Sequence, residues 1–198
     1  GVLQKYRGRA LLVATGSCAV HCRYCFRRHY PYGEDSAAAN AWQAALDTIA
    51  ADPSVDEVIL SGGDPLSLST AKLRELGERL LALPQVRRLR IHSRLPVVLP
   101  ERVDAELLDW LAALPLQKVM VIHANHAREF DESVARALTD LRGAGLTVLN
   151  QAVLLRGVND SVAAQVELAE ASFAAGSLPY YLHLLDRVAG AAHFEVPD

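Results

Sequence analysis

Three cysteines, Cys18, Cys22 and Cys25, are the side chains of this sequence with the clearest capacity for chemistry. They are its only cysteines, and all of them lie within one short segment. An odd number of closely spaced cysteines makes a poor disulfide framework and a good metal site, which favours a reducing, cytoplasmic setting. Thiolates bind iron strongly, and an ordinary [4Fe–4S] cluster takes four of them. Three thiolates would leave one iron of such a cluster open to another ligand.

A zinc site and a set of metal-free cysteines are the two alternatives that the residues themselves leave open. The three cysteines together with His21 or His29 would supply a Cys₃His donor set, and the chain would then be a zinc-binding module without catalysis. Iron and sulfide analysis after anaerobic reconstitution separates the two kinds of metal site, because only the cluster contains sulfide.

Size and composition predict one globular domain over residues 1–198. The chain has 198 residues, of which 51% are hydrophobic, and this is enough to bury one sizeable core. Its net charge of −3 predicts neither a nucleic-acid partner nor an anionic membrane partner. No apolar run approaches membrane-spanning length. Arginine greatly outnumbers lysine, and the guanidinium group suits fixed contacts to carboxylates and phosphates.

Apolar runs typical of strands alternate with amphipathic stretches typical of helices. Strands are expected at residues 10–15, 58–60, 89–93, 118–123, 147–155 and 178–183, and helices at 36–51, 69–82, 104–113, 131–144 and 161–175. Repeated strand–helix steps predict a parallel α/β sheet with right-handed crossovers, which fits an open doubly wound sheet or a barrel. Polar residues follow nearly every strand, and barrels carry their chemistry at that end. We therefore expect a partial (βα)6 TIM-like barrel.

The segment from Gly16 to Arg28 resembles the radical S-adenosylmethionine (SAM) superfamily, whose signature is C-x-x-x-C-x-x-C after a first strand. The resemblance implies a radical SAM barrel with a [4Fe–4S] cluster on Cys18, Cys22 and Cys25. The amino and carboxylate groups of SAM would then bind the open iron. An electron from the cluster would cleave the sulfonium and release a 5′-deoxyadenosyl radical.

Further stretches along nearly the whole chain resemble the lysine 2,3-aminomutase family, most closely the bacterial branch that modifies elongation factor P. They are Lys5-Tyr6-Arg7-Gly8-Arg9, Ser61-Gly62-Gly63-Asp64-Pro65, Ile91 to Val97, His123-Ala124-Asn125-His126, Asn150-Gln151, Leu154 to Asp160 and Pro179-Tyr180-Tyr181. The branch rests on residues 18–34 and on Ala189 to Phe194. The resemblance implies an isomerase that converts (S)-α-lysine to (R)-β-lysine with pyridoxal 5′-phosphate (PLP) beside SAM. A partner ligase would attach the product to elongation factor P.

The resemblance assigns roles to residues near the expected strand ends. The expected SAM contacts are Tyr24, Ser61, Gly62, Gly63, Asp64, Ser93 and His123. Arg27 would pair with the α-carboxylate of the substrate in a bidentate ion pair. Asp186, as a buried carboxylate, would receive the ε-ammonium and so select lysine over glutamate. The expected PLP contacts are Lys5, Tyr6, Arg9 and Gln151.

One family feature has no counterpart in the chain. Its lysines, Lys5, Lys72 and Lys118, do not match the lysine that forms the Schiff base with PLP. We therefore expect this sequence to be the radical SAM core of a longer protein, without an N-terminal extension and the C-terminal PLP-lysine segment. Such a fragment would hold the cluster and SAM but bind PLP weakly.

Partners and rival activities follow from the same resemblance. The implied partners are lysine, a reductant protein such as flavodoxin or ferredoxin, and elongation factor P with its lysine ligase, while assembly into a homo-oligomer stays open. Glutamate 2,3-aminomutase is the nearest rival, and Asp186 argues against it. A radical SAM enzyme without PLP, such as an activase or a peptide-modifying enzyme, is another. Loss of activity on removal of PLP would separate the aminomutase from the latter.

Overall fold

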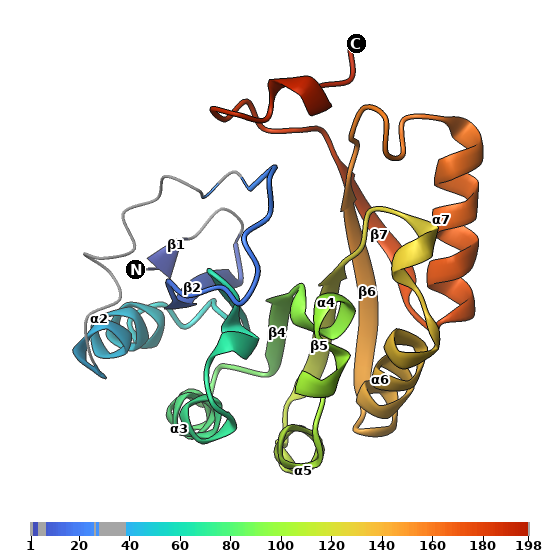
Figure 1. The fold of residues 1–198 in the computed structure, drawn as a ribbon. Coiled ribbons are helices and arrows are strands. Elements are labelled where there is room, and N and C mark those ends of the chain that lie inside the picture. Colours follow the sequence, from blue (N-terminus) through green and yellow to red (C-terminus); the bar gives the residue numbers. More distant parts are fainter. Residues whose placement is uncertain (1, 4–6, 26, 28–38, 198) are drawn as a thin grey trace.

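A seven-stranded sheet forms the centre of the fold, and its strands lie side by side in the order of the sequence (Figure 1). The computed structural model describes residues 2–3, 7–25, 27 and 39–197. The strands are β1 (Val2–Leu3), β2 (Arg9–Thr15), β3 (Glu57–Gly62), β4 (Arg88–Ser93), β5 (Gln117–His123), β6 (Leu146–Val153) and β7 (Leu178–His183). Strands β2 to β7 are parallel, whereas β1 pairs antiparallel with β2. Within the described residues, β1 and β7 are the two open edges of the sheet.

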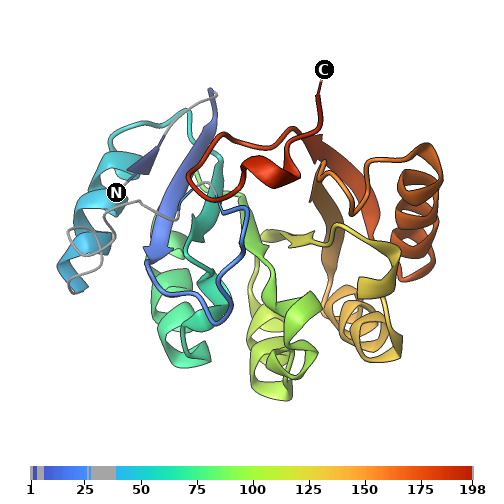
Figure 2. The same cartoon turned by 45° about the horizontal axis from the view of Figure 1, so that its top comes forward.

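The main helices cover the outer face of the curved sheet and leave its inner face open (Figure 2). They are α2 (Ala39–Ala50), α3 (Thr70–Leu81), α4 (Leu95–Val98), α5 (Ala105–Ala113), α6 (Glu132–Gly143) and α7 (Val162–Ala174). Short 3₁₀ helices are η1 (Pro65–Ser67), η2 (Pro100–Arg102), η3 (Ala127–Glu129) and η4 (Ala192–Phe194). Sequential parallel strands with helices on one face make an open barrel, which confirms the predicted partial (βα)6 TIM-like fold. No helix in the described ranges combines the length and apolarity needed to cross a membrane.

Local signals placed most element boundaries close to where they are observed. Ser69 caps α3, as predicted, and its Oγ accepts a hydrogen bond of 3.3 Å from the Lys72 amide. Asp104 caps α5 in the same way and stands just outside the helix that it was expected to begin. The elements β1 and α4 were not predicted, because two-residue and four-residue segments are too short to show a periodicity. Residues 36–38 of the first expected helix lie outside the described residues.

Alternation along the strands separates an apolar outer layer from a polar inner layer. Leu12, Leu60, Ile91 and Met120 are completely or almost completely buried between the sheet and the helices. Burial of each such side chain stabilises the fold by roughly 1.5–3 kcal/mol. The residues between them on the strands face inward, and this face is where the barrel can hold a polar site.

A buried carboxylate organises the inner face at the start of the strands. Glu57 is fully buried, and it pairs with Arg90 at 2.6 Å, Arg88 at 2.9 Å and Arg9 at 3.5 Å. Arg90 also reaches across the barrel and donates a 3.2 Å hydrogen bond to the Tyr180 hydroxyl on β7. Burial acts to raise the pKa of Glu57, but hydrogen bonds from Arg88 and Arg90 and the nearby positive charges outweigh it and lower that pKa.

Replacement of Glu57 by glutamine should lower the free energy of unfolding by about 2 kcal/mol at neutral pH, since hydrogen bonds to charged groups are lost. Because the folded-state pKa lies below the unfolded one, this contribution is present above the unfolded pKa and is lost as the pH falls through the folded pKa. Urea unfolding at pH 7 and at acidic pH measures both effects. We expect the difference between the two proteins to shrink on acidification, and an unchanged difference would contradict the ion-pair account.

Candidate active site

The loop that carries the three cysteines follows β2 and lies at the carboxyl edge of the sheet, in blue in Figure 1. Cys18, Cys22 and Cys25 are all partly buried, and the Cys25 amide donates to the Cys22 carbonyl at 3.2 Å. Burial raises the pKa of Cys18 to about 11, and the negative charges of Asp64, Cys25 and Cys22 act in the same direction. The three thiols therefore lie close enough to influence one another.

The thiols do not converge on a common centre as the sequence led us to expect. The part of the chain that the structure describes contains no group of three or more His, Cys, Asp or Glu side chains placed to hold a metal ion. Three thiols on one loop remain a donor set that suits an iron–sulfur cluster with one open iron. His21 is exposed, and His29 lies outside the described residues.

A glycine turn after β3 supports the base of the cysteine loop. The Gly63 amide donates to the Thr15 carbonyl at 2.8 Å, and the Asp64 amide donates to the Ser17 carbonyl at 2.7 Å. A Cβ atom on Gly62 would lie 2.3 Å from the Thr15 carbonyl oxygen, and one on Gly63 would lie 2.2 Å from that of Ser17. Gly62 also has a φ of 127°. The glycines therefore allow close approach of the cysteine loop, whereas the sequence led us to expect close approach of a ligand.

The side chains of Asp64 and Ser93, both expected to contact SAM, are buried and bind each other. The Ser93 hydroxyl donates to Asp64 Oδ1 at 2.6 Å and accepts from the Leu95 amide at 3.1 Å. Asp64 also accepts from the amides of Leu66 at 3.0 Å and Arg94 at 2.8 Å. Burial raises the pKa of Asp64 despite these hydrogen bonds. Their common effect is to join the ends of β3 and β4 beneath the cysteine loop.

Arg27 lies just beyond the third cysteine and binds the same glycine turn. Its Nη1 donates to Ser61 Oγ at 2.9 Å and to the Gly62 carbonyl at 3.0 Å. It also opposes the rise in the pKa of Cys18, which places its charge near that thiol. A fixed guanidinium beside the cysteine loop suits an anionic group of a bound ligand, because it can donate two parallel hydrogen bonds.

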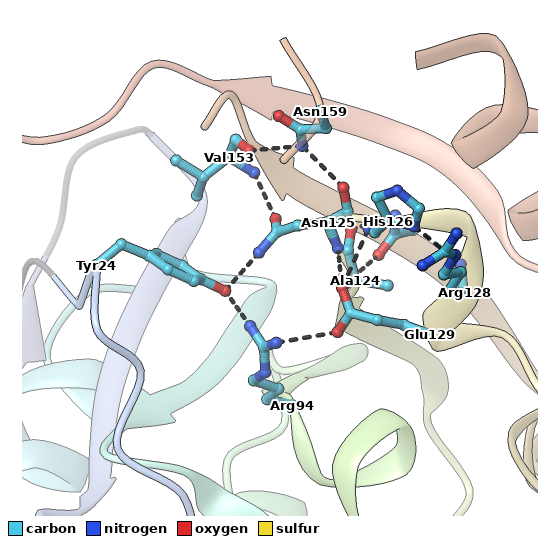
Figure 3. Close-up of polar contacts among 10 residues, drawn as sticks. Tyr24, Arg94, Ala124, Asn125, His126, Arg128, Glu129, Val153 and Asn159 are labelled. Carbon is cyan, nitrogen blue, oxygen red and sulfur yellow. Dashed lines mark hydrogen bonds and ion pairs between the residues drawn. The ribbon is translucent and has the colours of Figure 1, made fainter. Parts of the chain in front are cut away.

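Tyr24 connects the cysteine loop to the ends of β4, β5 and β6 (Figure 3). Its hydroxyl is bonded to the Arg94 guanidinium and accepts from Asn125 Nδ2 at 2.6 Å. Arg94 in turn pairs with Glu129 at 2.9 Å. Burial raises the pKa of Tyr24 to about 12, against the opposing charge of Arg94. Sequence reasoning identified Tyr24 only as an expected SAM contact and gave Glu129 no role.

Two histidines line the inner face one level below this network. His123 is hydrogen-bonded through Nε2 to Gln151 Nε2 at 2.8 Å, and its ring meets that of His92 edge-on at 6.1 Å between centroids. Burial lowers the pKa of each histidine to about 3, so both are neutral at physiological pH. His92 Nε2 is buried without a partner among the described residues. His92 was missed as a candidate, although the alternation Arg88-Leu89-Arg90-Ile91-His92 indicates a polar inner face on β4.

Of the residues expected to bind PLP, Arg9 and Gln151 are in the described part of the chain, and they lie at different levels of the barrel. Lys5 and Tyr6 lie outside the described residues. In the register of the sheet, Arg9 lies level with Gln117, the first residue of β5. Gln151 lies level with His123, the last residue of β5. Six residues of strand separate these levels by about 20 Å. Arg9 therefore pairs with Glu57 far from the cysteine loop, and this corrects the expectation that it brings PLP to the same end of the barrel.

The segment after β7 crosses the open side of the barrel, in red in Figure 2. Asp186 is exposed there, so its expected burial is wrong for the described chain. It lines a cavity of about 300 Å³ with Leu185, Arg187 and Ala192 among others. The same segment contacts the cysteine loop: the Arg23 guanidinium is 3.3 Å from His193 Nε2 and lies over the Phe194 ring.

The fold and the site define a class of protein: an open (βα)6 barrel with a thiol-rich loop and a polar inner face at the carboxyl ends of its strands. Residues 12–168 match the family described as the Radical SAM superfamily. The chain belongs to the radical SAM superfamily, and membership implies a [4Fe–4S] cluster and SAM.

Curated relatives and solved structures agree with this membership. The chain is 52% identical over 198 residues to L-lysine 2,3-aminomutase of Escherichia coli K12, and 51% identical over 197 residues to the protein of that name from Haemophilus influenzae. Each alignment covers 100% of this chain but 58% of the relative. A structure of anSMEcpe with bound AdoMet and the Kp18Cys peptide shares the fold, with a TM-score of 0.67 at 11% identity over 94% of this chain and 54% of that one.

Proposed function

We propose that the protein to which this chain contributes is a lysine 2,3-aminomutase that converts (S)-α-lysine to (R)-β-lysine. The observation that carries the proposal is the identity of 52% across the whole chain to a relative of that name. The cysteine loop and the fixed Arg27 are consistent with it, because they place a donor set for iron and a carboxylate-binding group side by side. The chain spans 58% of that relative, so the activity, substrate and partners of the whole protein are part of the proposal.

In this proposal each part of the site has a defined task. Cys18, Cys22 and Cys25 would hold the cluster, which would supply the one electron for reductive cleavage of SAM to methionine and a 5′-deoxyadenosyl radical. Arg27 binds the substrate carboxylate, and the neutral His123 and Gln151 line the inner wall and can donate or accept hydrogen bonds without adding charge. PLP is a second proposed cofactor, although Arg9 and Gln151 lie at different levels of the barrel.

The proposed cellular role rests on the resemblance of residues 18–34 and of Ala189 to Phe194 to the branch that modifies elongation factor P. We infer that the β-lysine serves the modification of elongation factor P through its ligase, and that a cytoplasmic flavodoxin or ferredoxin supplies the electron. A deletion strain whose elongation factor P loses the mass of one β-lysyl group, and regains it when β-lysine is added to the medium, would support this role. Unchanged modification in the deletion strain would overturn it.

The activity itself is tested with the full-length protein, incubated anaerobically with reductant, SAM, PLP and a panel of amino acids. We expect β-lysine from lysine and no β-amino acid from glutamate or alanine, and we expect the product to disappear when PLP is removed. A product from glutamate but not from lysine would make the protein a glutamate 2,3-aminomutase. Activity that persists without PLP would place it among other radical SAM enzymes.

Replacement of Arg27 by lysine should raise the KM for lysine at least about tenfold, because a point charge replaces the bidentate fork. The comparison is steady-state β-lysine formation, with Arg136→Lys on the exposed face of α6 as the matched control. An unchanged KM in the Arg27 variant would show that its contacts to Ser61 and Gly62 are purely structural.

A further inference from the structure

The hydroxyl of Tyr24 is the point at which the cysteine loop is fastened to three strands of the barrel (Figure 3). We propose that Arg94 and Glu129 are positioning residues that hold the Cys22–Cys25 segment over the ends of β4 and β5. Arg94 binds the Tyr24 hydroxyl, and Glu129 binds Arg94. The inference rests on the proposed function only where it concerns the cluster. We call Tyr24, Arg94, Glu129 and Asn125 the latch.

Arg94 is fixed from two sides, which makes it a rigid part of the latch. Its backbone amide donates to Asp64 Oδ2 at 2.8 Å, and its Nη2 donates to Glu129 Oε2 at 2.9 Å. The side chains of Arg94 and Glu129 are only 19% and 23% exposed, so their ion pair is better shielded from solvent than a surface pair. The guanidinium also lies over the Tyr24 ring, 5.6 Å from its centroid.

Glu129 uses both carboxylate oxygens, one for the latch and one for the backbone beneath it. Oε2 accepts from Arg94, while Oε1 accepts from the amides of Asn125 at 2.7 Å and His126 at 3.1 Å. These amides belong to the turn after β5, which the carboxylate therefore shapes. The position of the guanidinium is thus determined by the end of β5 and by the end of β3, through Asp64.

Asn125 forms the second arm of the latch. Its Nδ2 donates to Tyr24 at 2.6 Å, and its Oδ1 accepts from the Val153 amide at 2.8 Å. Its carbonyl accepts from the buried Asn159 Nδ2 at 2.8 Å. The side-chain nitrogen, the side-chain oxygen and the backbone carbonyl of Asn125 thus each have a partner, in the cysteine loop, in β6 and in the segment after β6 respectively. The latch is therefore a connected polar network, in which loss of one partner leaves others unpaired.

The latch also lies beside two proposed ligands of the cluster, because Tyr24 stands between Cys22 and Cys25 in the sequence. The Arg94 guanidinium lies over the ring of Tyr24 and brings a positive charge to this segment. Net charge and solvent exposure near a cluster are among the factors that set its reduction potential. Mutation of a residue that binds a metal ligand typically lowers metal affinity or activity by about 10- to 100-fold. The latch should therefore affect both the order of the loop and the properties of the cluster.

Two conservative variants of the full-length protein test the inference. Tyr24→Phe keeps the ring and removes the hydroxyl. Glu129→Gln keeps an oxygen for the two backbone amides and removes the charge that holds Arg94. Glu132→Gln is the matched control, since Glu132 forms an exposed pair with Arg136 on α6 at 3.1 Å.

The first measurement is amide hydrogen exchange of residues 16–25 in the metal-free protein. We expect both latch variants to exchange about tenfold faster there, with the rest of the chain and the control unchanged, because loss of a charge-assisted hydrogen bond favours local opening. Unchanged exchange in either variant would overturn the inference. A uniform increase along the whole chain would also overturn it, because that result describes a general loss of stability.

The second measurement is the midpoint potential and electron paramagnetic resonance spectrum of the reconstituted cluster. We expect both latch variants to have a shifted midpoint potential and an altered spectrum, which the control variant should not show. Wild-type potential and spectrum in both variants would remove the cluster part of the inference. If local exchange increases in both latch variants but the wild-type protein binds no iron and sulfide, the proposed function is wrong and the positioning role of the latch is still supported.

Discussion

Replacement of Cys22 by serine is expected to abolish the [4Fe–4S] cluster and reductive cleavage of SAM in the full-length protein. The loop offers three thiols, and the sequence contains no fourth cysteine to replace one of them. A serine hydroxyl remains protonated at neutral pH and cannot act as the soft thiolate that iron–sulfur clusters need. Because even outer partners of a metal ligand affect activity by about 10- to 100-fold, loss of a ligand should reduce cleavage more than about 100-fold.

The measurement is iron and sulfide per chain together with the yield of 5′-deoxyadenosine after reduction. Ala19→Ser, which introduces a serine at an exposed position of the same loop, is the matched control and should retain the cluster. Wild-type content of iron and sulfide in the Cys22 variant would show that the cluster does not depend on this thiol. It would thereby contradict the assignment of the loop.

Replacement of Gly63 by alanine should strongly destabilise the base of the cysteine loop. A Cβ atom there would lie 2.2 Å from the Ser17 carbonyl oxygen and 2.8 Å from the Gly16 carbonyl carbon. Both neighbours are backbone atoms at the base of the cysteine loop, so the loop itself must move. We expect the free energy of unfolding to fall by about 3 kcal/mol or more, which is the upper end of the usual cost of overpacking. We also expect the variant to incorporate iron poorly.

Gly143→Ala is the control for this variant. Nothing lies within 4 Å of a Cβ atom built at Gly143, the last residue of α6, so alanine should leave stability unchanged or raise it by up to about 1 kcal/mol. Denaturant unfolding and iron analysis of both variants make the comparison. A Gly63 variant as stable and as well loaded as the control would contradict the observed contact between the glycine turn and the loop.

The strands, the caps and the cysteine loop could be predicted because their signals are local. Ser69 precedes a helical periodicity, the run from Leu178 to His183 has the length of a strand, and the cysteines are neighbours in the sequence. Parallel strands with short connections then bring their carboxyl ends to one edge. The chain positions of Arg27 and His123, just after the third cysteine and at the end of β5, were enough to place them near the loop.

Partners far apart in the sequence could not be predicted in the same way. Nothing local pairs Tyr24 with Arg94, or Arg90 with Tyr180, because alternation shows which residues share a face but not which residues meet across it. Arg9 is an example. The family resemblance implied a cofactor contact for it, whereas in the structure the buried carboxylate of Glu57 binds it at the start of the strand.

The most direct test of the account is anaerobic reconstitution of the full-length protein with iron and sulfide, followed by reduction in the presence of SAM. The account predicts four iron and four sulfide per chain, as expected for one [4Fe–4S] cluster, and release of 5′-deoxyadenosine and methionine. Zinc without sulfide, and SAM that survives reduction, would contradict it.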